Sequence, residues 1–144
     1  MALTEPDDHI NSLARIAVDA AFQVHSTLGP GFLESIYRDA MAVELKLRGV
    51  PFGREVPIGV LYKGYTVGRG FLDLLVDERL VVELKAVEEL APIHTAQLLS
   101  YLKATRLPLG LLITFNVHQI RRGIRRVVLT QPGNDASPSD PTSE

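Results

Sequence analysis

The chain has 144 residues, a net charge of −2, 46% hydrophobic residues and no cysteine. This length and composition fit one folded domain with its own core, and exclude a disordered chain. The lack of cysteine excludes disulfides and thiolate zinc sites and suits the reducing cytoplasm. No basic segment with an apolar run opens the chain, and no apolar run approaches the roughly 20 residues of a membrane span, so we expect neither signal peptide nor membrane partner.

The charges are distributed unevenly along the chain. Residues 1–8 and 131–144 hold six of the 17 acids and no Lys or Arg, which leaves 11 acids beside all 15 basic residues in residues 9–130. We therefore expect a flexible acidic N-terminus over 1–8, a single domain over 9–130 and a disordered, Pro- and Ser-rich tail over 131–144. The net charge of +4 on the domain permits a polyanionic partner.

Two helices are predicted first. Apolar residues at helical spacing predict a helix over 11–28, capped by Asp8 or Asn11 and ended by Gly29-Pro30-Gly31. A second helix is predicted over 33–48, with Gly49 at its end. Its buried stripe is expected to be Ile36, Ala40, Val43 and Leu47. The two make an N-terminal helical hairpin.

A motif, Gly31-x-x-Glu34-x-x-Tyr37, lies where the second helix begins. Glu34 falls in the first turn, where a carboxylate suits the helix dipole. Tyr37 is one turn further on and covers the same side. Glu34 is therefore either a helix-start acid or a member of a functional site, and these alternatives stay open on the helix pattern alone.

Three strands are predicted next, the second of them longer and shared by two hairpins, with Asp73 on the second and Glu83 and Lys85 on the third. Alternating residues predict strands over 56–62 and 65–70 around a Lys63-Gly64 turn, and Glu55 before them is expected to be solvated. Phe71–Val76 and Leu80–Lys85 form a second hairpin about Glu78.

The register of the second hairpin opposes Asp73 and Glu83 on one face. Lys85, two residues after Glu83, shares that face. Like charges opposed across strands repel, so the pair needs a cation, and a divalent metal supplies one. A solvated hairpin face is the alternative, but Leu74–Val76 and Val81–Leu84 are too continuously apolar for a sheet with one wet side.

A third helix is predicted from Pro92 to about Thr105, with Leu98, Leu99 and Leu102 toward the sheet. Gln97 and Tyr101 are four residues apart and share a face that overlooks Lys85. Leu109–Phe115 reads as a buried strand and Ile124–Leu129 as an edge strand.

Several arginines and two histidines are further candidates for functional residues. Arg121 and Arg122 open a cluster with Arg125 and Arg126 that either binds phosphates or is a solvated face. His25 and His94 lie near motifs, but no second histidine stands at ligand spacing, so we expect structural hydrogen bonds from both.

Together these motifs resemble the bacterial GxxExxY proteins, which are similar to the PD-(D/E)XK nuclease superfamily. The likeness rests on the Gly31 motif, Asp73-Leu-Leu-Val, Val-Glu83-Leu-Lys85-Ala and His94-x-x-Gln97-Leu-Leu-x-Tyr101-Leu, and covers residues 9–129. It implies an α/β, restriction-endonuclease-like core, a central mixed β-sheet flanked by helices. Phe71 departs from the arginine found in many relatives.

The resemblance also implies roles. Asp73 and Glu83 would bind Mg²⁺ or Mn²⁺ with Glu34 as the added acid, Lys85 would be the catalytic lysine, and Gln97 would assist it. Substrate would meet Tyr37, Tyr101, Arg121 and Arg122. We expect a nuclease acting on DNA or RNA; the alternative is a catalytically silent module that binds nucleic acid or a protein. The small core also favours a homo-oligomer or a protein partner.

Overall fold

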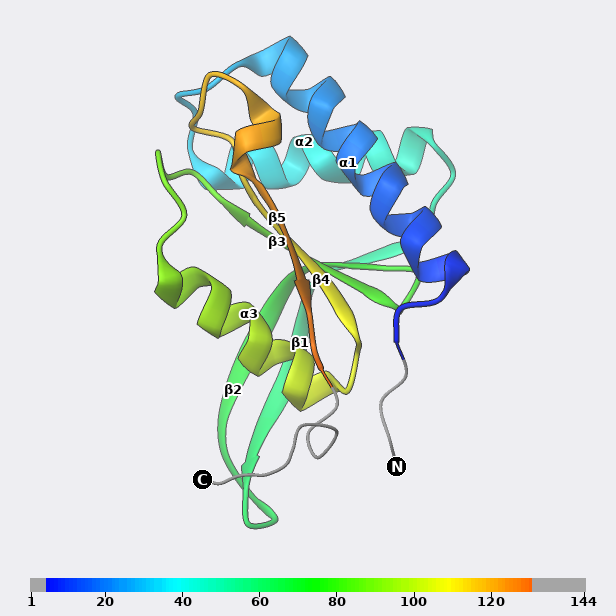
Figure 1. The fold of residues 1–144 in the computed structure, drawn as a ribbon, viewed down its shortest axis with the longest axis vertical. Coiled ribbons are helices and arrows are strands. Elements are labelled where there is room, and N and C mark those ends of the chain that lie inside the picture. The colour runs from blue at the N-terminus through cyan, green and yellow to red at the C-terminus, as the bar shows by residue number, and fades with distance from the viewer. Residues whose placement is uncertain (1–4, 131–144) are drawn as a thin grey trace.

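The computed structural model describes residues 5–130, in which five strands form one mixed sheet (Figure 1). The order is β1 (Phe52–Tyr62), β2 (Tyr65–Val76), β3 (Leu80–Lys85), β4 (Leu109–Thr114) and β5 (Ile124–Val128). The β3–β4 pairing is parallel, and the other three pairings are antiparallel. The predicted α/β fold with a mixed central sheet is confirmed. The tail predicted over 131–144 and residues 1–4 lie outside the described residues.

Helices cover both faces of this sheet. The helices are α1 (Asp8–Leu28), α2 (Glu34–Leu47) and α3 (Pro92–Thr105), with a 3₁₀ turn, η1 (Ile120–Gly123). In Figure 1, α1 and α2 lie together on one side and α3 on the other. The predicted cap of α1 is wrong: Asp7 is the N-cap, and its Oδ1 accepts a hydrogen bond from the Ile10 amide at 2.9 Å. Within residues 5–130, no helix has the length and apolar character to cross a bilayer.

Two hydrophobic cores result, one on each face of the sheet. Leu74, Val82 and Leu84 pack with α1 and α2, whereas Val81 and Leu112 pack with α3. Strand β3 is buried along almost its whole length because it contributes to both cores. The continuous apolar pattern predicted this burial correctly.

The predicted buried stripe of α2 is wrong for three of its four residues; the fourth, Ala40, is partly buried and packs against the core. Val43 and Leu47 are 57% and 76% exposed, and Ile36 is also exposed. The buried face is instead Tyr37, Met41, Ala42 and Leu45. Both sets have helical spacing, and the second faces the core because it carries the larger side chains toward α1 and the sheet.

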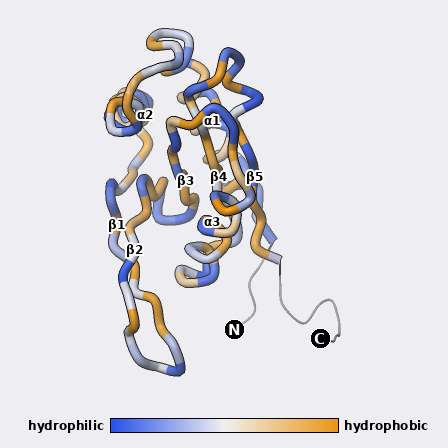
Figure 2. The backbone as a smooth tube through the Cα atoms, turned by 90° about the vertical axis from the view of Figure 1, so that its left-hand side faces the viewer, coloured by the Kyte–Doolittle hydropathy of each residue, from blue (hydrophilic) through white to orange (hydrophobic). Residues whose placement is uncertain are grey.

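The β1–β2 hairpin is longer than predicted, and its outer part projects past α3 (Figures 1 and 2). Lys63 and Gly64 form its two-residue turn with φ of 50° and 86°, as expected for a type I′ turn. Pro57 is tolerated within β1 because β1 is an edge strand of the sheet.

Candidate functional site

The sheet opens between β2 and β3 where two carboxylates interlock. Ladder pairing runs from the turn to the Leu74–Val82 pair and stops there. In the next position, the Asp73 amide donates to Glu83 Oε2 at 2.9 Å, and the Leu84 amide donates to Asp73 Oδ2 at 2.8 Å. Each carboxylate thus binds a backbone N–H of the neighbouring strand. Asp73 and Glu83 meet as the hairpin register predicts.

Strand β2 also twists at Asp73. Leu72 and Leu74 are two apart and should share a face, yet Leu72 packs in the α3 core and Leu74 in the α1–α2 core. Opposite Asp73 in the β1–β2 register is Glu55, whose φ is 48°. Positive φ is uncommon for a residue other than glycine and marks a local kink. The kink turns the outer hairpin away from the rest of the sheet.

Glu83 is nearly fully buried, at 5% exposure. Burial, then the charge of Asp73, raises its pKa to about 8, and a smaller contribution comes from Glu34. The hydrogen bond from the Asp73 amide and the positive charge of Lys85 oppose this shift in pKa. A solvated hairpin face, the alternative that the sequence left open, is therefore wrong for this carboxylate.

Arg38, on α2, contacts three carboxylates around the site. Its guanidinium is 3.3 Å from Glu34 Oε2, 3.4 Å from Glu55 Oε2 and 3.5 Å from Asp73 Oδ1. Its Nε is buried and, among the residues that the structure describes, makes no hydrogen bond. Glu34 therefore reaches the site through Arg38. We call Glu34, Glu55, Asp73 and Glu83 the acidic cluster.

Lys85, Gln97 and Tyr101 form a polar line beside the acidic cluster. Lys85 Nζ donates to Gln97 Oε1 at 3.4 Å, and Gln97 Nε2 donates to the Tyr101 hydroxyl at 3.5 Å. Burial raises the pKa of Tyr101, and the negative charges of Glu83 and Asp73 raise it further. The phenol therefore stays protonated. As predicted, Gln97 lies against Lys85.

The donor chemistry of the cluster fits a hard divalent cation. Carboxylate oxygens are the ligands that Mg²⁺ and Mn²⁺ prefer. Asp73 and Glu83 each bind a backbone amide through one oxygen; the second oxygen of Glu83 could bind an ion directly, whereas Oδ1 of Asp73 could do so only in place of its 3.5 Å contact with Arg38. Within residues 5–130, however, no three His, Cys, Asp or Glu side chains are grouped to hold a metal. Arg38 contacts both Glu34 and Asp73, so Glu34 would become a third ligand only after Arg38 moves.

Tyr37 does not lie in the site, so its predicted contact with substrate is wrong. Its side chain is fully buried, and its ring stacks on Phe115 with centroids 4.5 Å apart. Its hydroxyl donates to the Gly29 carbonyl at 2.5 Å and accepts from the Phe32 amide at 3.1 Å. Tyr37 therefore fixes the loop between α1 and α2.

The four arginines near the C-terminal strand do not form one patch. Arg126 donates to Asn11 on α1, whereas Arg125 donates to Thr95 on α3, both at 2.7 Å. Adjacent strand residues point to opposite faces, which separates this pair. Arg121 and Arg122 lie on η1, and in the described part of the chain no hydrogen bond or ion pair joins them to the acidic cluster.

His25 and His94 make structural hydrogen bonds, as predicted. The His25 ring bonds to the Val117 carbonyl, and the His94 ring accepts from the Ala91 amide.

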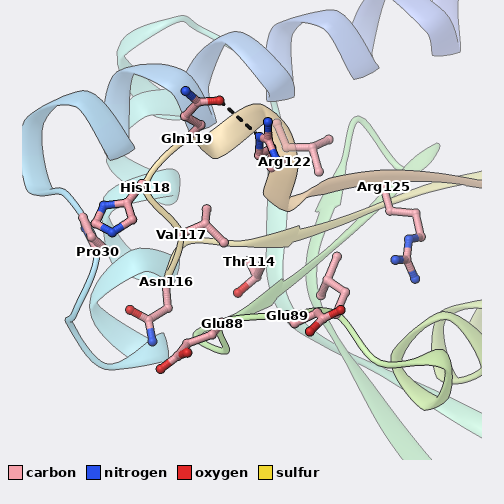
Figure 3. A pocket seen from close by; sticks show the side chains of 12 residues that line it. Pro30, Glu88, Glu89, Thr114, Asn116, Val117, His118, Gln119, Arg122 and Arg125 are labelled. Atoms are coloured by element: carbon pink, nitrogen blue, oxygen red, sulfur yellow. Dashed lines mark hydrogen bonds between the residues drawn. The ribbon is translucent and has the colours of Figure 1, made fainter.

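A cavity of about 930 Å³ lies past the ends of β3 and β4 (Figure 3). Its charged and polar lining includes Glu88, Glu89, Asn116, His118, Arg122 and Arg125. Within residues 5–130, that lining includes no member of the acidic cluster and not Lys85. Arg122 is thus placed in a separate cavity from Asp73 and Glu83.

Comparison with known proteins gives one match. A family model described as the PD-(D/E)XK nuclease superfamily matches residues 11–127. The matched range begins in α1 and ends in β5, so it contains the whole acidic cluster and the residues from Lys85 to Tyr101. No curated protein and no solved structure matches the chain.

Proposed function

The chain belongs to the PD-(D/E)XK nuclease superfamily, and from that membership we propose that it is a metal-dependent nuclease that hydrolyses phosphodiester bonds in DNA or RNA. The superfamily implies a nucleic acid substrate and typically uses divalent metals. Within it, the spacing of Gly31, Glu34 and Tyr37 supports assignment to the GxxExxY proteins. The observation that carries the proposal is the interlocked Asp73–Glu83 pair beside Lys85.

Asp73 and Glu83 are the proposed ligands of Mg²⁺ or Mn²⁺. The bound ion would supply Lewis-acid polarisation of a phosphoryl group. Glu83 must lose its proton to bind a cation, and its raised pKa means that this proton is lost near pH 8. Arg38 would then lose its pairing with Asp73 and could turn its guanidinium to a substrate phosphate while it keeps its contacts with Glu34 and Glu55.

Lys85 is the proposed catalytic residue. In hydrolysis, a water oxygen bonds to phosphorus, the bond to the leaving sugar oxygen breaks, and negative charge develops on the phosphoryl oxygens. An ammonium beside the ligands stabilises that charge. Gln97 accepts a hydrogen bond from the Lys85 ammonium through its side-chain oxygen, and in this proposal the protonated Tyr101 phenol would donate to a phosphate.

A catalytically silent module that binds nucleic acid or a protein is the second candidate. The observation in its favour is Arg38, which already pairs with Glu34 and Asp73 and so balances part of the negative charge without a metal. Such a module would bind its partner equally well with and without divalent ions.

A paired measurement of binding and cleavage separates these candidates. Wild type, Lys85→Ala and the control Lys103→Ala, an exposed lysine on α3, are incubated with labelled single- and double-stranded DNA and RNA in Mn²⁺. The nuclease proposal predicts that Lys85→Ala cuts at least about 100-fold more slowly, as when a transition-state donor is removed, while its binding is retained. Binding without cleavage by wild type, or undiminished cleavage by Lys85→Ala, would refute the nuclease.

A further inference from the structure

The projecting part of the β1–β2 hairpin, residues 57–71, is named here the arm. Five of its large side chains are 54% to 77% exposed: Leu61, Tyr62, Tyr65, Val67 and Phe71. Figure 2 shows hydrophobic positions continuing along the arm beyond the body of the molecule. Monomeric proteins rarely expose so many neighbouring apolar side chains unless the surface binds a partner.

The charges of the arm indicate the kind of partner. Between Pro57 and Phe71 the sequence has two basic residues, Lys63 and Arg69, and no acid. Arg69 is paired across the strands with Gly59, so no side chain opposes its guanidinium. The arm thus carries only positive charge, so an anionic ligand would approach it without repulsion.

The tip of the arm offers both surfaces that a nucleotide needs. Tyr62 and Tyr65 are directly paired and therefore project from the same face. The Lys63 ammonium is 5.4 Å from the centre of the Tyr62 ring. Aromatic rings stack with unpaired bases, and a neighbouring cation binds the phosphate.

Resting on the proposed nuclease function, we propose that the arm binds single-stranded nucleic acid and leads it to the acidic cluster. Duplex binding depends mainly on many phosphate contacts, and the arm has only two cations. Its exposed rings instead suit bases that are free to stack.

The arm is continuous with the site. Both include residues of strand β2, which runs without interruption from Tyr65 in the arm through Asp73 to Val76. At about 3.3 Å per residue, Tyr65 lies roughly 26 Å from Asp73 along the strand, the length of about eight stacked nucleotides at 3.4 Å each. Tyr101 holds the base of the arm, because its ring would touch any side chain placed at Gly70. A strand bound at the tip would thus reach the acidic cluster.

The test measures binding without cleavage. A labelled 15-nucleotide single strand is titrated in EDTA against wild type, Tyr62→Ala/Tyr65→Ala, the ring-preserving Tyr62→Phe/Tyr65→Phe, and Phe22→Ala as an exposed aromatic control on α1. We expect the double alanine variant to bind at least about fivefold more weakly, as for one lost stacking contact. The double phenylalanine and Phe22→Ala variants should bind like wild type.

The outcomes separate this proposal from the nuclease itself. Binding by wild type through the arm, without cleavage in Mn²⁺, would refute the nuclease and leave the arm proposal standing. Equal binding by wild type and the double alanine variant would overturn the arm proposal, whatever the cleavage. The arm proposal would also be overturned if the double alanine variant lost as much affinity for a duplex of the same sequence as for the single strand. A dimer in sedimentation that the double alanine variant abolishes would show that the arm joins two copies of the chain, and would overturn it too.

Discussion

Glu83 couples the stability of the fold to pH. Its pKa is about 8 in the folded protein, against an ordinary value of 4.5. Between these values the folded state keeps a proton that the unfolded chain has released, so the free energy of unfolding falls as pH rises. The slope contributed is at most about 1.4 kcal/mol per pH unit. Urea denaturation from pH 5 to 8.5 should show this slope in wild type and its absence in Glu83→Gln. If the free energy of unfolding depended on pH in the same way in both proteins, the expectation would be contradicted.

Arg38 is the second residue on which the acidic cluster depends. Arg38→Gln leaves Glu34, Glu55 and Asp73 without their shared cation, so we expect the free energy of unfolding to fall by about 1–3 kcal/mol, less than for a fully buried pair. Mg²⁺ should restore part of this loss. Urea denaturation with and without Mg²⁺ measures both effects.

The control for Arg38 is Arg54→Gln, because Arg54 pairs with Asp39 on the surface. An exposed ion pair contributes under about 1 kcal/mol, and Mg²⁺ should not change that contribution. Equal losses in the two variants would show that Arg38 has no special place in the cluster.

At the scale of elements, the loop between α1 and α2 is fixed by one hydroxyl. Tyr37→Phe keeps the ring on Phe115 but removes both hydrogen bonds to the loop backbone, at Gly29 and Phe32. We expect the free energy of unfolding to fall by about 1–2 kcal/mol, with cleavage per folded molecule nearly unchanged. Thermal denaturation and a single-turnover assay check this. A large loss of cleavage with normal stability would return Tyr37 to substrate binding.

The sequence predicted the elements best where turn residues and apolar runs were unambiguous. Strand β3 and helix α3 have the predicted bounds, because Pro92 marks a helix start and the Leu- and Val-rich run before it has no helical period. The buried face of α2 was predicted wrongly, since Ile36–Leu47 contains two apolar stripes and only tertiary packing selects one. The 3₁₀ turn η1 was not predicted, because four residues carry too little pattern.

Part of the candidate site was also predictable. Strand register and side-chain parity bring Asp73 and Glu83 together without knowledge of the fold. Arg38 was missed, although its position four residues after Glu34 on one helix was a readable signal. Glu55 was expected to be solvated, and it is largely exposed, although it also pairs with Arg38. Its positive φ could not be predicted from the sequence, because glutamate rarely adopts that backbone conformation.

For the whole molecule, binding of a divalent ion should stabilise the folded state. Once Glu83 has lost its proton, Mn²⁺ would offset the repulsion between Asp73 and Glu83, so above about pH 8 it should raise the melting temperature of wild type. Asp73→Asn should lose this increase and is expected to be no less stable without metal, because an amide oxygen still accepts from Leu84 and one repelling charge is gone. Asp19→Asn, an exposed acid on α1, is the control. Equal increases in all three proteins would place the ion elsewhere.

The two interlocked carboxylates also bear on which residues of the site would be substituted first if the protein lost its activity. Asp73 and Glu83 complete the ladder where the strands part, so selection for folding alone would preserve a side-chain oxygen acceptor at both positions after any loss of activity. The Lys85 side chain has no such protection, because the hydrogen bond that its ammonium makes within residues 5–130, to Gln97, is long and exposed. In a lineage that had stopped cutting nucleic acid, we therefore expect Lys85 to be replaced first, while Asp, Asn, Glu or Gln would remain at positions 73 and 83.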